Sequence, residues 1–225
     1  MAVENKVLSG QKVLSKNDEI AAVLRDDFKK HRVLVFNLVS SPGSGKTTLL
    51  EKTITTLKDK INLAIIAGDV QTENDADRLI KAGCDKVVPI VTGGACHLDA
   101  AMVQKALEHL DLKTIDLLFI ENVGNLVCPA GYDLGEDMKI ALVSTPEGDD
   151  KPSKYPTMFR RSSVLVLNKL DLLGTSDFDL QRFKTNVFKI RADMKTFDMS
   201  CRSGQGLDNW FTWLINRVAS RKSGG

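Results

Sequence analysis

The sequence predicts an α/β fold with a mainly parallel sheet of seven strands and helices on both faces. Seven apolar runs of strand length are spread along the chain, and several are continuously hydrophobic, which is typical of strands buried on both faces. Amphipathic helical stretches separate most of these runs, and this alternation implies right-handed crossovers between parallel strands. Ligands of such sheets bind beyond the carboxyl ends of the strands, so we searched the loops that follow those ends.

The predicted elements follow one another in a regular order. One further helix, over about Asn17–His31, precedes the first strand and could pack on the sheet or serve a partner, and Gly83 ends the helix after the second strand. The strands are predicted over Val33–Val39, Leu63–Ala67, Val87–Val91, Ile115–Ile120, Lys139–Ser144, Val164–Leu167 and Lys195–Ser200. The other helices are predicted over Thr47–Leu57, Glu73–Ala82, Leu98–Leu110, Asp177–Ala192 and Leu207–Ser220.

Composition limits the domain count and the classes of partner. The chain has 225 residues without a Pro-, Gly- or Ser-rich linker, which predicts one domain over residues 1–225 with a short helical extension over about residues 1–31. Its 31 basic and 29 acidic side chains nearly cancel, and no basic run is interleaved with aromatics, so we expect no nucleic-acid partner. The apolar stretches are of strand length and the first residues lack the apolar core of a signal peptide, so we expect a cytoplasmic protein that does not bind membranes.

A glycine-rich loop, "SSPGSGKT", follows the first predicted strand and opens the next helix. This strand, loop and helix context is that of a phosphate-binding loop, or P-loop. Gly43 and Gly45 let backbone N–H groups turn toward phosphate oxygens, Lys46 reaches the β and γ phosphates, and the Thr47 hydroxyl binds Mg²⁺. Ser40 stands where the standard pattern has its first glycine, a departure that only some P-loop families tolerate. Ser44 and Thr48 complete the predicted phosphate-binding set.

The sequence "NKLD" at Asn168, Lys169 and Asp171 follows a later apolar strand and matches the NKxD element that recognises guanine. The Asp171 carboxylate can accept hydrogen bonds from N1–H and the 2-amino group of guanine, whereas adenine has an acceptor at N1 and no 2-amino group. The chain is therefore predicted to bind GTP. After the next strand we expect a short loop to close over the base, and it contains Ser200, Cys201 and Arg202, with Cys201 as a packing residue.

Two acidic residues end predicted strands at the nucleotide edge of the sheet, Asp69 and Glu121. We expect Asp69 to bind Mg²⁺ or its waters and Glu121 to bind a metal-bound water, which makes Lys46, Asp69 and Glu121 the predicted catalytic set, because phosphoryl transfer needs mainly positioning and charge stabilisation. The backbone N–H of Gly124 is expected at the γ-phosphate.

Some roles around this centre stay open. Asp75 and Asp77 could orient the attacking water or form a solvated helix face. We expect slow hydrolysis, because no arginine finger in cis is evident.

A cysteine and a histidine are adjacent in "GGACHLDA", after the third predicted strand. Cys96 and His97 are placed at the start of the helix predicted from Leu98, where a thiol has a lowered pKa, and Cys128 lies in the Gly- and Pro-rich loop after Glu121. Two thiolates and one imidazole suit Ni²⁺ or Zn²⁺ and exclude a hard cation. Isolated cysteines are more often small buried hydrophobes, and from spacing alone both interpretations remain open.

Several longer motifs resemble the HypB family of nickel-incorporation GTPases in nickel–iron hydrogenase maturation. They are "SSPGSGKTTLL", "GDVQTENDADR", "GGACHLDA", "ENVGNLVCPAGYDLGE", "STPEGDDKPSKYPTMF" and "NKLDLL". The resemblance implies a G domain of the SIMIBI class of P-loop NTPases, dimerisation that depends on GTP, and a nickel or zinc site at the dimer interface formed by Cys96, His97 and Cys128. It also implies a HypA-like nickel chaperone as a partner and the hydrogenase large subunit as the client.

The chain departs from many members of that family near its start, because residues 1–30 contain neither cysteine nor histidine. A high-affinity nickel store there is therefore not expected. The hypothesis that follows from the residues and the resemblance is that GTP and Mg²⁺ move the loop that runs from Glu121 to Cys128, and so make or break coordination with Cys96 and His97. The segment Pro146–Pro156 is expected to be a long polar loop that either moves with the nucleotide against a neighbouring subunit or is plain surface.

Three alternatives remain at this stage. A urease-type nickel GTPase is similar, but its family has a contiguous Cys-Pro-His, whereas the two cysteines are separate in this chain. A P-loop kinase for a small molecule is disfavoured by the guanine element, and a nucleotide-dependent scaffold with negligible turnover stays open.

Overall fold

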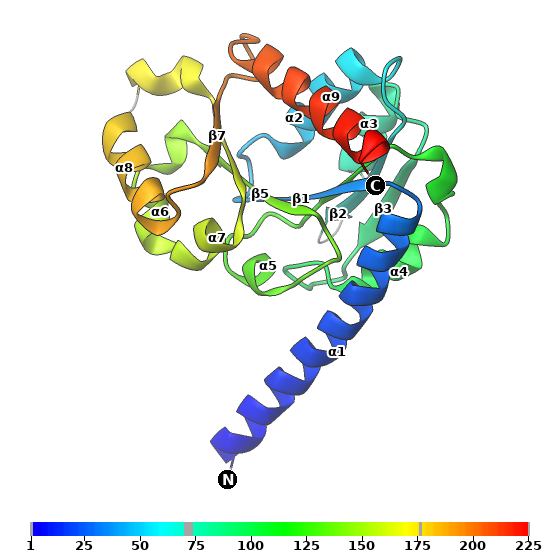
Figure 1. Ribbon diagram of the computed structural model, residues 1–225. Helices are drawn as coiled ribbons and strands as arrows, with labels where there is room; N and C mark the ends of the chain where they lie inside the picture. The colour runs from blue at the N-terminus through cyan, green and yellow to red at the C-terminus, as the bar shows by residue number, and fades with distance from the viewer. Residues whose placement is uncertain (1, 70–73, 176, 225) are drawn as a thin grey trace.

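The computed structural model describes residues 2–69, 74–175 and 177–224, with side chains from residue 13 onward (Figure 1). Its centre is a sheet in the order β3-β2-β4-β1-β5-β6-β7. The strands are β1 Leu34–Ser40, β2 Leu63–Asp69, β3 Val87–Val91, β4 Leu117–Glu121, β5 Met138–Ser144, β6 Val164–Asn168 and β7 Lys195–Asp198. Every pair of neighbouring strands is parallel, which confirms the predicted fold class and the seven predicted strands.

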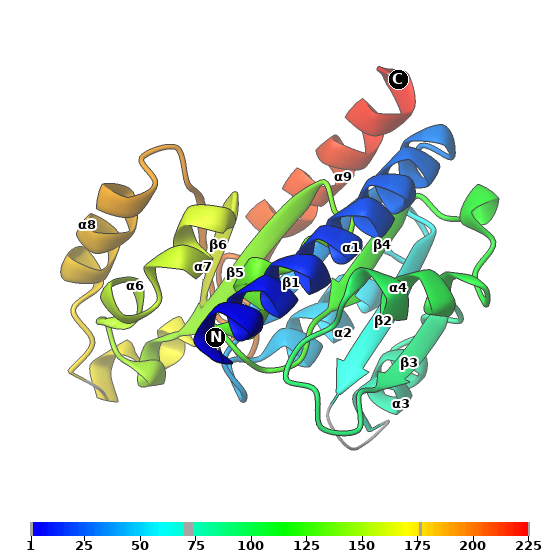
Figure 2. The same cartoon turned by 90° about the horizontal axis from the view of Figure 1, so that it is seen from below.

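Helices pack on both faces of the sheet (Figures 1 and 2). On one face α2 (Lys46–Leu57), α3 (Asn74–Lys81) and α9 (Leu207–Ser223) cover the even-numbered residues of β1. On the other face, α1 (Ala2–Lys30) and α4 (Ala100–Leu107) cover one half, and α5 (Cys128–Gly131), α7 (Pro156–Arg161) and α8 (Leu180–Ile190) cover the other. Side chains alternate across a strand, so β1 contributes to both layers and is buried along its whole length.

The connections that follow β1 and β4 lead toward opposite edges of the sheet. β1 lies between β4 and β5, with Leu38 opposite Glu121 on one side and Ile140 on the other. The chain leaves β1 toward α2, and it leaves the neighbouring β4 in the opposite direction. Where two neighbouring parallel strands are followed by connections in opposite directions, a crevice forms beyond their carboxyl ends, and open α/β sheets bind ligands there.

Helix α1 is longer than predicted, because it begins at Ala2 and the expected helix began near Asn17. Figures 1 and 2 show its first half extending away from the sheet, while its second half lies along α4. The second half is amphipathic, and Ala21, Leu24 and Phe28 are buried against the sheet and α4. Hydrophobic burial on that side explains why the sequence pattern indicated only this half.

Several element boundaries differ from the prediction. α4 begins at Ala100 and not at Leu98, because the side chain of Asp99 accepts a hydrogen bond from Met102 N and caps the helix. α8 begins at Leu180, where Asp179 caps it in the same way, and not at Asp177. Residue Glu73, the predicted start of α3, lies outside the described residues.

Two segments predicted as loops contain short helices. Pro146–Pro156 overlaps the 3₁₀ turn η2 (Thr145–Glu147) and includes α6 (Lys151–Lys154), so it is not the irregular loop that its polarity suggested. The loop after Glu121 contains the one-turn helix α5, which starts at Cys128. Two further 3₁₀ turns are η1 (Leu112–Thr114) and η3 (Leu170–Thr175). Proline in the first turn of α5, α6 and α7 is compatible with helix starts, because those N–H groups have no partner within the helix.

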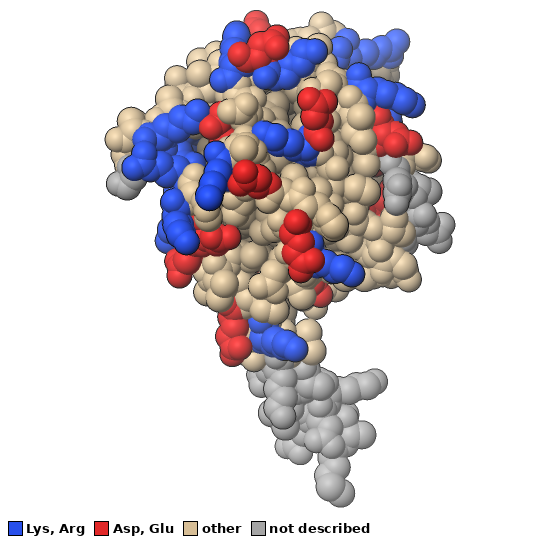
Figure 3. Space-filling model, turned by 90° about the vertical axis from the view of Figure 1, so that its right-hand side faces the viewer, with Lys and Arg blue, Asp and Glu red and all other residues tan. Residues whose placement is uncertain are grey.

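The surface carries charges of both signs. On the face in Figure 3, acidic and basic side chains are interspersed and do not separate into regions of one sign. Among the described residues, no helix has both the length and the apolar character that crossing a membrane requires.

Candidate functional site

The phosphate-binding loop connects β1 to α2 as predicted. Gly43 and Gly45 have φ angles of 73° and 100°, in the left-handed region that favours glycine. A Cβ at Gly45 would lie 2.5 Å from the Asn168 amide nitrogen, so this position also needs glycine for space. Ser40, which replaces the usual glycine, accepts a hydrogen bond of 2.9 Å from Lys46 Nζ and so holds the lysine across the loop.

A cavity of about 420 Å³ opens over this loop. Three carboxylates and two cations face it, from four different elements. The lining includes Gly43, Gly45, Lys46, Thr47, Thr48, Asp69, Asp75, Arg78, Glu121 and Gly124. The structure thus brings together the predicted phosphate, magnesium and catalytic residues, apart from Ser44, which is buried beneath the loop. Gly124 packs directly on the loop, because a Cβ there would lie 3.1 Å from the Pro42 backbone.

Glu121 is a buried carboxylate, 2% exposed, at the end of strand β4, next to the central strand β1. Its Oε1 accepts a hydrogen bond of 2.8 Å from Thr47 Oγ1, and its Oε2 has no hydrogen-bond partner among the described residues. Burial raises the pKa of Glu121 to about 7, although the positive charge of Lys46 lowers it. A hydroxyl and an unsatisfied carboxylate oxygen at one buried point suit a hard cation such as Mg²⁺, so the residues present fit the predicted magnesium site.

Lys46 is partly buried and lines the same cavity. Burial lowers the pKa of its ammonium group, and the nearby carboxylates of Glu121 and Asp75 oppose that shift. A cation that lines the cavity at the end of a phosphate-binding loop is available to anionic ligands.

Two residues of α3 complete the cavity. The Arg78 guanidinium donates to both carboxylate oxygens of Glu51, at 3.0 and 2.8 Å, and to Asp75 at 3.2 Å. The sequence prediction missed Arg78 and left Asp75 and Asp77 undecided. Asp75 lines the cavity whereas Asp77 is exposed to solvent. Only the packing of α3 against α2 shows which face of this short helix points at the phosphates.

A second cavity, of about 540 Å³, shares Gly45 and Thr48 with the first. Asn168, Lys169, Asp171, Cys201 and Arg202 line it, so the predicted base-recognition residues lie together at the end of the phosphate groove.

The NKxD segment is tied to the phosphate-binding loop on one side. The Asn168 side chain donates to Ser44 O at 2.9 Å and accepts from Cys201 N at 3.1 Å. Lys169 has a φ angle of 61° and its Nζ donates to Gly43 O at 2.7 Å. These bonds fix the distance between the two cavities.

The Asp171 carboxylate is positioned by the loop after β7. Ser200 Oγ donates a short hydrogen bond of 2.5 Å to its Oδ1. Ser200 is itself buried, and its Oγ accepts a hydrogen bond from Ser203 N. The loop over the predicted base site is therefore stabilised by hydrogen bonds within it. Cys201 is buried, and burial raises the pKa of its thiol to about 11, as expected of a packing residue.

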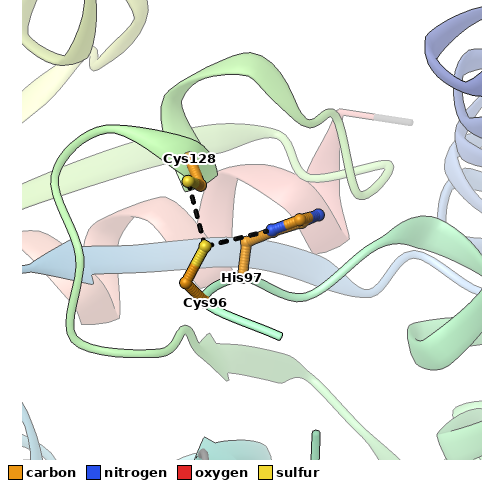
Figure 4. Close-up of side chains that lie close together, drawn as sticks. All are labelled: Cys96, His97 and Cys128. Carbon is orange, nitrogen blue, oxygen red and sulfur yellow. Dashed lines mark hydrogen bonds between the residues drawn. The ribbon is translucent and has the colours of Figure 1, made fainter. Parts of the chain in front are cut away.

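The predicted soft-metal residues lie together at one point (Figure 4). Cys96 Sγ is 3.0 Å from Cys128 Sγ and 3.8 Å from His97 Nδ1, and one ligand atom from each residue lies within 4.8 Å of the others. Cys96 is exposed, and the other two are partly buried. The cluster therefore faces solvent at Cys96 and packs against the protein at His97 and Cys128.

Two chain segments bring these ligands together. Cys96 and His97 are in the loop between β3 and α4, and Cys128 is the first residue of α5, after β4. The Asn125 side chain joins them, because it donates to Cys96 O at 3.2 Å and accepts from Val127 N at 2.8 Å. The His97 ring packs on the Tyr132 ring with centroids 3.9 Å apart.

One part of the sequence interpretation of this cluster is wrong. Cys96 is not at a helix N-terminus, because His97, Leu98 and the capping Asp99 lie between it and α4. The hydrogen bond with Cys96 instead raises the pKa of the Cys128 thiol. Burial lowers the pKa of His97, which favours the neutral imidazole that binds metals, although Asp99 opposes the shift. Cys84, His31 and His109 lie outside the cluster, as expected.

Comparison with known proteins is consistent with this geometry. A family model described as the CobW/HypB/UreG nucleotide-binding domain matches residues 34–198. The hydrogenase maturation factor HypB of Rhizobium leguminosarum bv. viciae is 45% identical over 98% of this chain and 74% of its own length. That of Escherichia coli strain K12 is 48% identical over 90% of this chain and 69% of its own length. A crystal structure of HypB from Helicobacter pylori in complex with nickel has a TM-score of 0.86 and 41% identity, and covers 91% of this chain and 96% of its own.

The buried carboxylate at the phosphate cavity makes stability depend on pH. The folded pKa of Glu121 is raised to about 7 from 4.5, so the folded state binds more protons than the unfolded state between these values. The contribution of Glu121 to the free energy of unfolding should therefore be fully present below about pH 4.5 and fall by roughly 2–4 kcal/mol as the pH rises through 7.

Chemical denaturation from about pH 5 to about pH 8, without metal or nucleotide, measures this effect. Glu121→Gln keeps the volume of the side chain and removes the ionisation, so its stability should decline less over this interval than that of the natural chain. Parallel pH profiles for the two proteins would contradict the buried ionisation.

Proposed function

The chain belongs to the CobW/HypB/UreG family and, within it, to the HypB hydrogenase maturation factors, and on this premise we propose that it is a GTP-hydrolysing nickel chaperone. In this proposal the GTP state controls the binding and release of Ni²⁺, or Zn²⁺, at Cys96, His97 and Cys128 during nickel–iron hydrogenase maturation. The observation that carries the proposal is the gathering of these three soft ligands within 4.8 Å, one of them, Cys128, on the segment that begins at the buried Glu121 of the nucleotide cavity.

The nucleotide would occupy the two connected cavities. The backbone N–H groups around Gly43 and Gly45 and the start of α2 would bind the phosphates, with Lys46 at the β and γ positions. Thr47, Asp69 and Glu121 would hold Mg²⁺, which supplies charge stabilisation when bound. Ser44 supports the loop from below, and its hydroxyl donates to Glu147 Oε1 at 2.7 Å.

Guanine selectivity would rest on Asp171. Its carboxylate faces the second cavity and is positioned by Ser200 Oγ. Asn168 and Lys169 bond to the phosphate loop, so they would set the base at a fixed distance from the phosphates. Cys201 and Arg202 would close the loop over the base.

Hydrolysis would be slow in the isolated subunit. Arg78 is a guanidinium in the phosphate cavity, but it is bonded to Glu51 and Asp75, so its charge is already compensated. An arginine that stabilises a transition state must direct its donors at the transferred phosphoryl group. In the described conformation Arg78 acts as a clasp between α2 and α3.

The metal would be cargo held at the surface. Two thiolates and one neutral imidazole match the ligand preferences of Ni²⁺ and Zn²⁺. Cys96 is exposed, which leaves a side from which a partner could supply or remove the ion. We therefore propose a HypA-like chaperone as donor or acceptor and the hydrogenase large subunit as client. We further propose that GTP promotes a homodimer of this single G domain, with α1 as its helical extension.

The nucleotide and the metal would be coupled through the segment from Glu121 to Cys128. Gly124 in this segment packs on Pro42 of the phosphate loop, and Asn125 bonds to Cys96 O. A shift of Gly124 toward a bound γ-phosphate would therefore displace both cysteines relative to each other. A nucleotide-dependent scaffold without turnover is separated from this proposal by an assay of GTP and ATP hydrolysis with and without Ni²⁺.

Asp171→Asn should change the base that the protein binds. The amide can no longer accept two hydrogen bonds from guanine, so GTP affinity should fall by a factor on the order of 10²–10⁴. Xanthine carries an oxygen where guanine has its 2-amino group, so xanthosine triphosphate should bind the variant better than it binds the natural chain. Calorimetric titration with both nucleotides measures the exchange, and equal loss of both would show that Asp171 serves folding and not base recognition.

Cys128→Ser should weaken nickel binding without affecting GTP binding. A hydroxyl is a poor ligand for Ni²⁺, so the dissociation constant should rise by at least about 10- to 100-fold. Cys84→Ala is the matched control, because it removes a buried thiol outside the cluster. Competition with a chelating dye measures the affinity. Unchanged nickel affinity in Cys128→Ser would contradict the assigned site.

A further inference from the structure

The metal cluster is the group of Cys96, His97 and Cys128. A row of hydrogen bonds between buried side-chain amides leads from it across the sheet. Asn122, the residue after Glu121, accepts a hydrogen bond at Oδ1 from Leu98 N, at 3.1 Å, next to His97. Its Nδ2 donates to Asn37 Oδ1, at 3.2 Å, on the neighbouring strand β1. Both asparagine residues are 0% exposed.

We call the loop that carries Cys96 and His97 and the segment that carries Cys128 the two arms of the metal cluster. The chain of hydrogen bonds continues from the first arm to the second through two buried charges. Asn37 Nδ2 donates to Glu136 Oε1 at 3.2 Å, and Glu136 pairs with Lys139 at 3.5 Å. Lys139 Nζ donates to the carbonyl oxygens of Pro129 and Tyr132, at 2.9 and 2.7 Å. The side chains of Glu136 and Lys139 are only 7% and 6% exposed.

The two ends of this chain set its hydrogen-bond direction. At one end Asn122 Oδ1 receives the backbone N–H groups of Leu98 and Val123, so the amide nitrogen of Asn122 must point to Asn37. At the other end a carboxylate can only accept, so Asn37 must donate to Glu136. Each amide therefore has one compatible orientation, and a change at one end leaves a buried group unpaired unless its neighbours move with it.

Asn122 also belongs to the nucleotide cavity. It lines this cavity beside Glu121 and Val123, while its side chain binds the segment that carries Cys96 and His97. The far end of the chain holds the carbonyl groups of the turn that begins at Cys128. One buried network thus contacts the phosphate cavity and both arms of the metal cluster.

A second bridge between the same arms avoids the nucleotide cavity. Asn17 of α1 accepts from Ala100 N at 2.8 Å, after the Cys96 arm, and donates to Asp133 O at 2.9 Å, after the Cys128 arm. Arg25 strengthens this contact through a 2.6 Å ion pair with Asp133. Asn17 does not line the phosphate cavity. Besides the local link through Asn125, the described residues thus form two asparagine bridges between the arms, and of these two the one through Asn122 lines the nucleotide cavity.

We propose that Asn122, Asn37, Glu136 and Lys139 form the buried relay through which the nucleotide state sets the geometry of the metal cluster, with Asn37 and Lys139 as positioning residues. The inference rests on the proposed function, because it requires metal at the cluster. When the backbone at Asn122 shifts with the nucleotide, Leu98 N on one side and Asn37 on the other follow to keep their bonds. The two arms then move relative to each other.

Matched serine variants separate this relay from general loosening of the cluster. We compare the natural chain, Asn37→Ser and Asn17→Ser as full-length proteins. For each, the dissociation constant of Ni²⁺ is measured with GDP and with a non-hydrolysable GTP analogue, and their ratio is the nucleotide effect. Thermal unfolding checks folding, and the near-ultraviolet thiolate-to-nickel absorption checks that sulfur ligands remain. If Asn37→Ser does not fold, Lys139→Gln, which keeps an N–H donor and removes the charge, replaces it.

The natural chain should show a nucleotide effect of about 5- to 150-fold. Asn37→Ser should reduce it to within roughly twofold of one and retain the thiolate absorption, because the ligands persist while the coupling is lost. Asn17→Ser should keep the natural ratio. A natural ratio in Asn37→Ser, or an equal loss in Asn17→Ser, would overturn the relay alone. A natural chain with no nucleotide effect would overturn the coupling altogether, and nickel binding that survives Cys96→Ser with Cys128→Ser would reject the proposed function itself.

Discussion

The hydrogen bond between Thr47 Oγ1 and Glu121 Oε1, 2.8 Å long, joins the end of the phosphate loop to strand β4 of the sheet. It exists because β4 pairs in parallel with β1, with Leu38 opposite Glu121, so both strands end at the same edge. The residues that follow Glu121 then have a fixed origin at the nucleotide cavity, and the cysteine of α5 lies at the end of this segment. The separation between the phosphate cavity and the group of Cys96, His97 and Cys128 is therefore set by strand register and by the two loops that carry these residues.

Buried charges around that edge have a common physical logic. Glu121 and Lys46 line the phosphate cavity, and the pair of Glu136 and Lys139 binds the turn that begins at Cys128. Charges removed from water reduce stability unless partners compensate for them, and networks of this kind specify one arrangement of the groups they join. At the first position the raised pKa of Glu121 indicates incomplete compensation, which a cation would provide. At the second, backbone carbonyl groups provide it, and the cost of burial is offset by a defined position for the turn at Cys128.

The sequence predicted the strands because parallel strands buried on both faces appear as continuous apolar runs, and it predicted the phosphate loop because glycine, lysine and threonine follow a fixed spacing. It named Cys96, His97 and Cys128 from their chemistry, whereas their proximity depends on the path of two loops that carry no periodicity. Asn37 and Lys139 could not be recognised from the sequence. Asn37 is a polar residue within an apolar strand, and only the strand register brings it to its partner Asn122. Arg78 was missed for a similar reason, since a short helix can present any face. The first half of α1 was missed because the apolar periodicity that marks a packed helix is confined to the second half.

In the proposed mechanism, nucleotide and metal share one free energy of interaction. The most direct test is reciprocal: the affinity for a non-hydrolysable GTP analogue relative to GDP is measured at zero and at saturating Ni²⁺, and is compared with the change in nickel affinity between the same two nucleotides. The two factors should be equal and differ from one, because linkage between two binding sites is symmetrical. Nucleotide affinities that stay the same at every nickel concentration would contradict it.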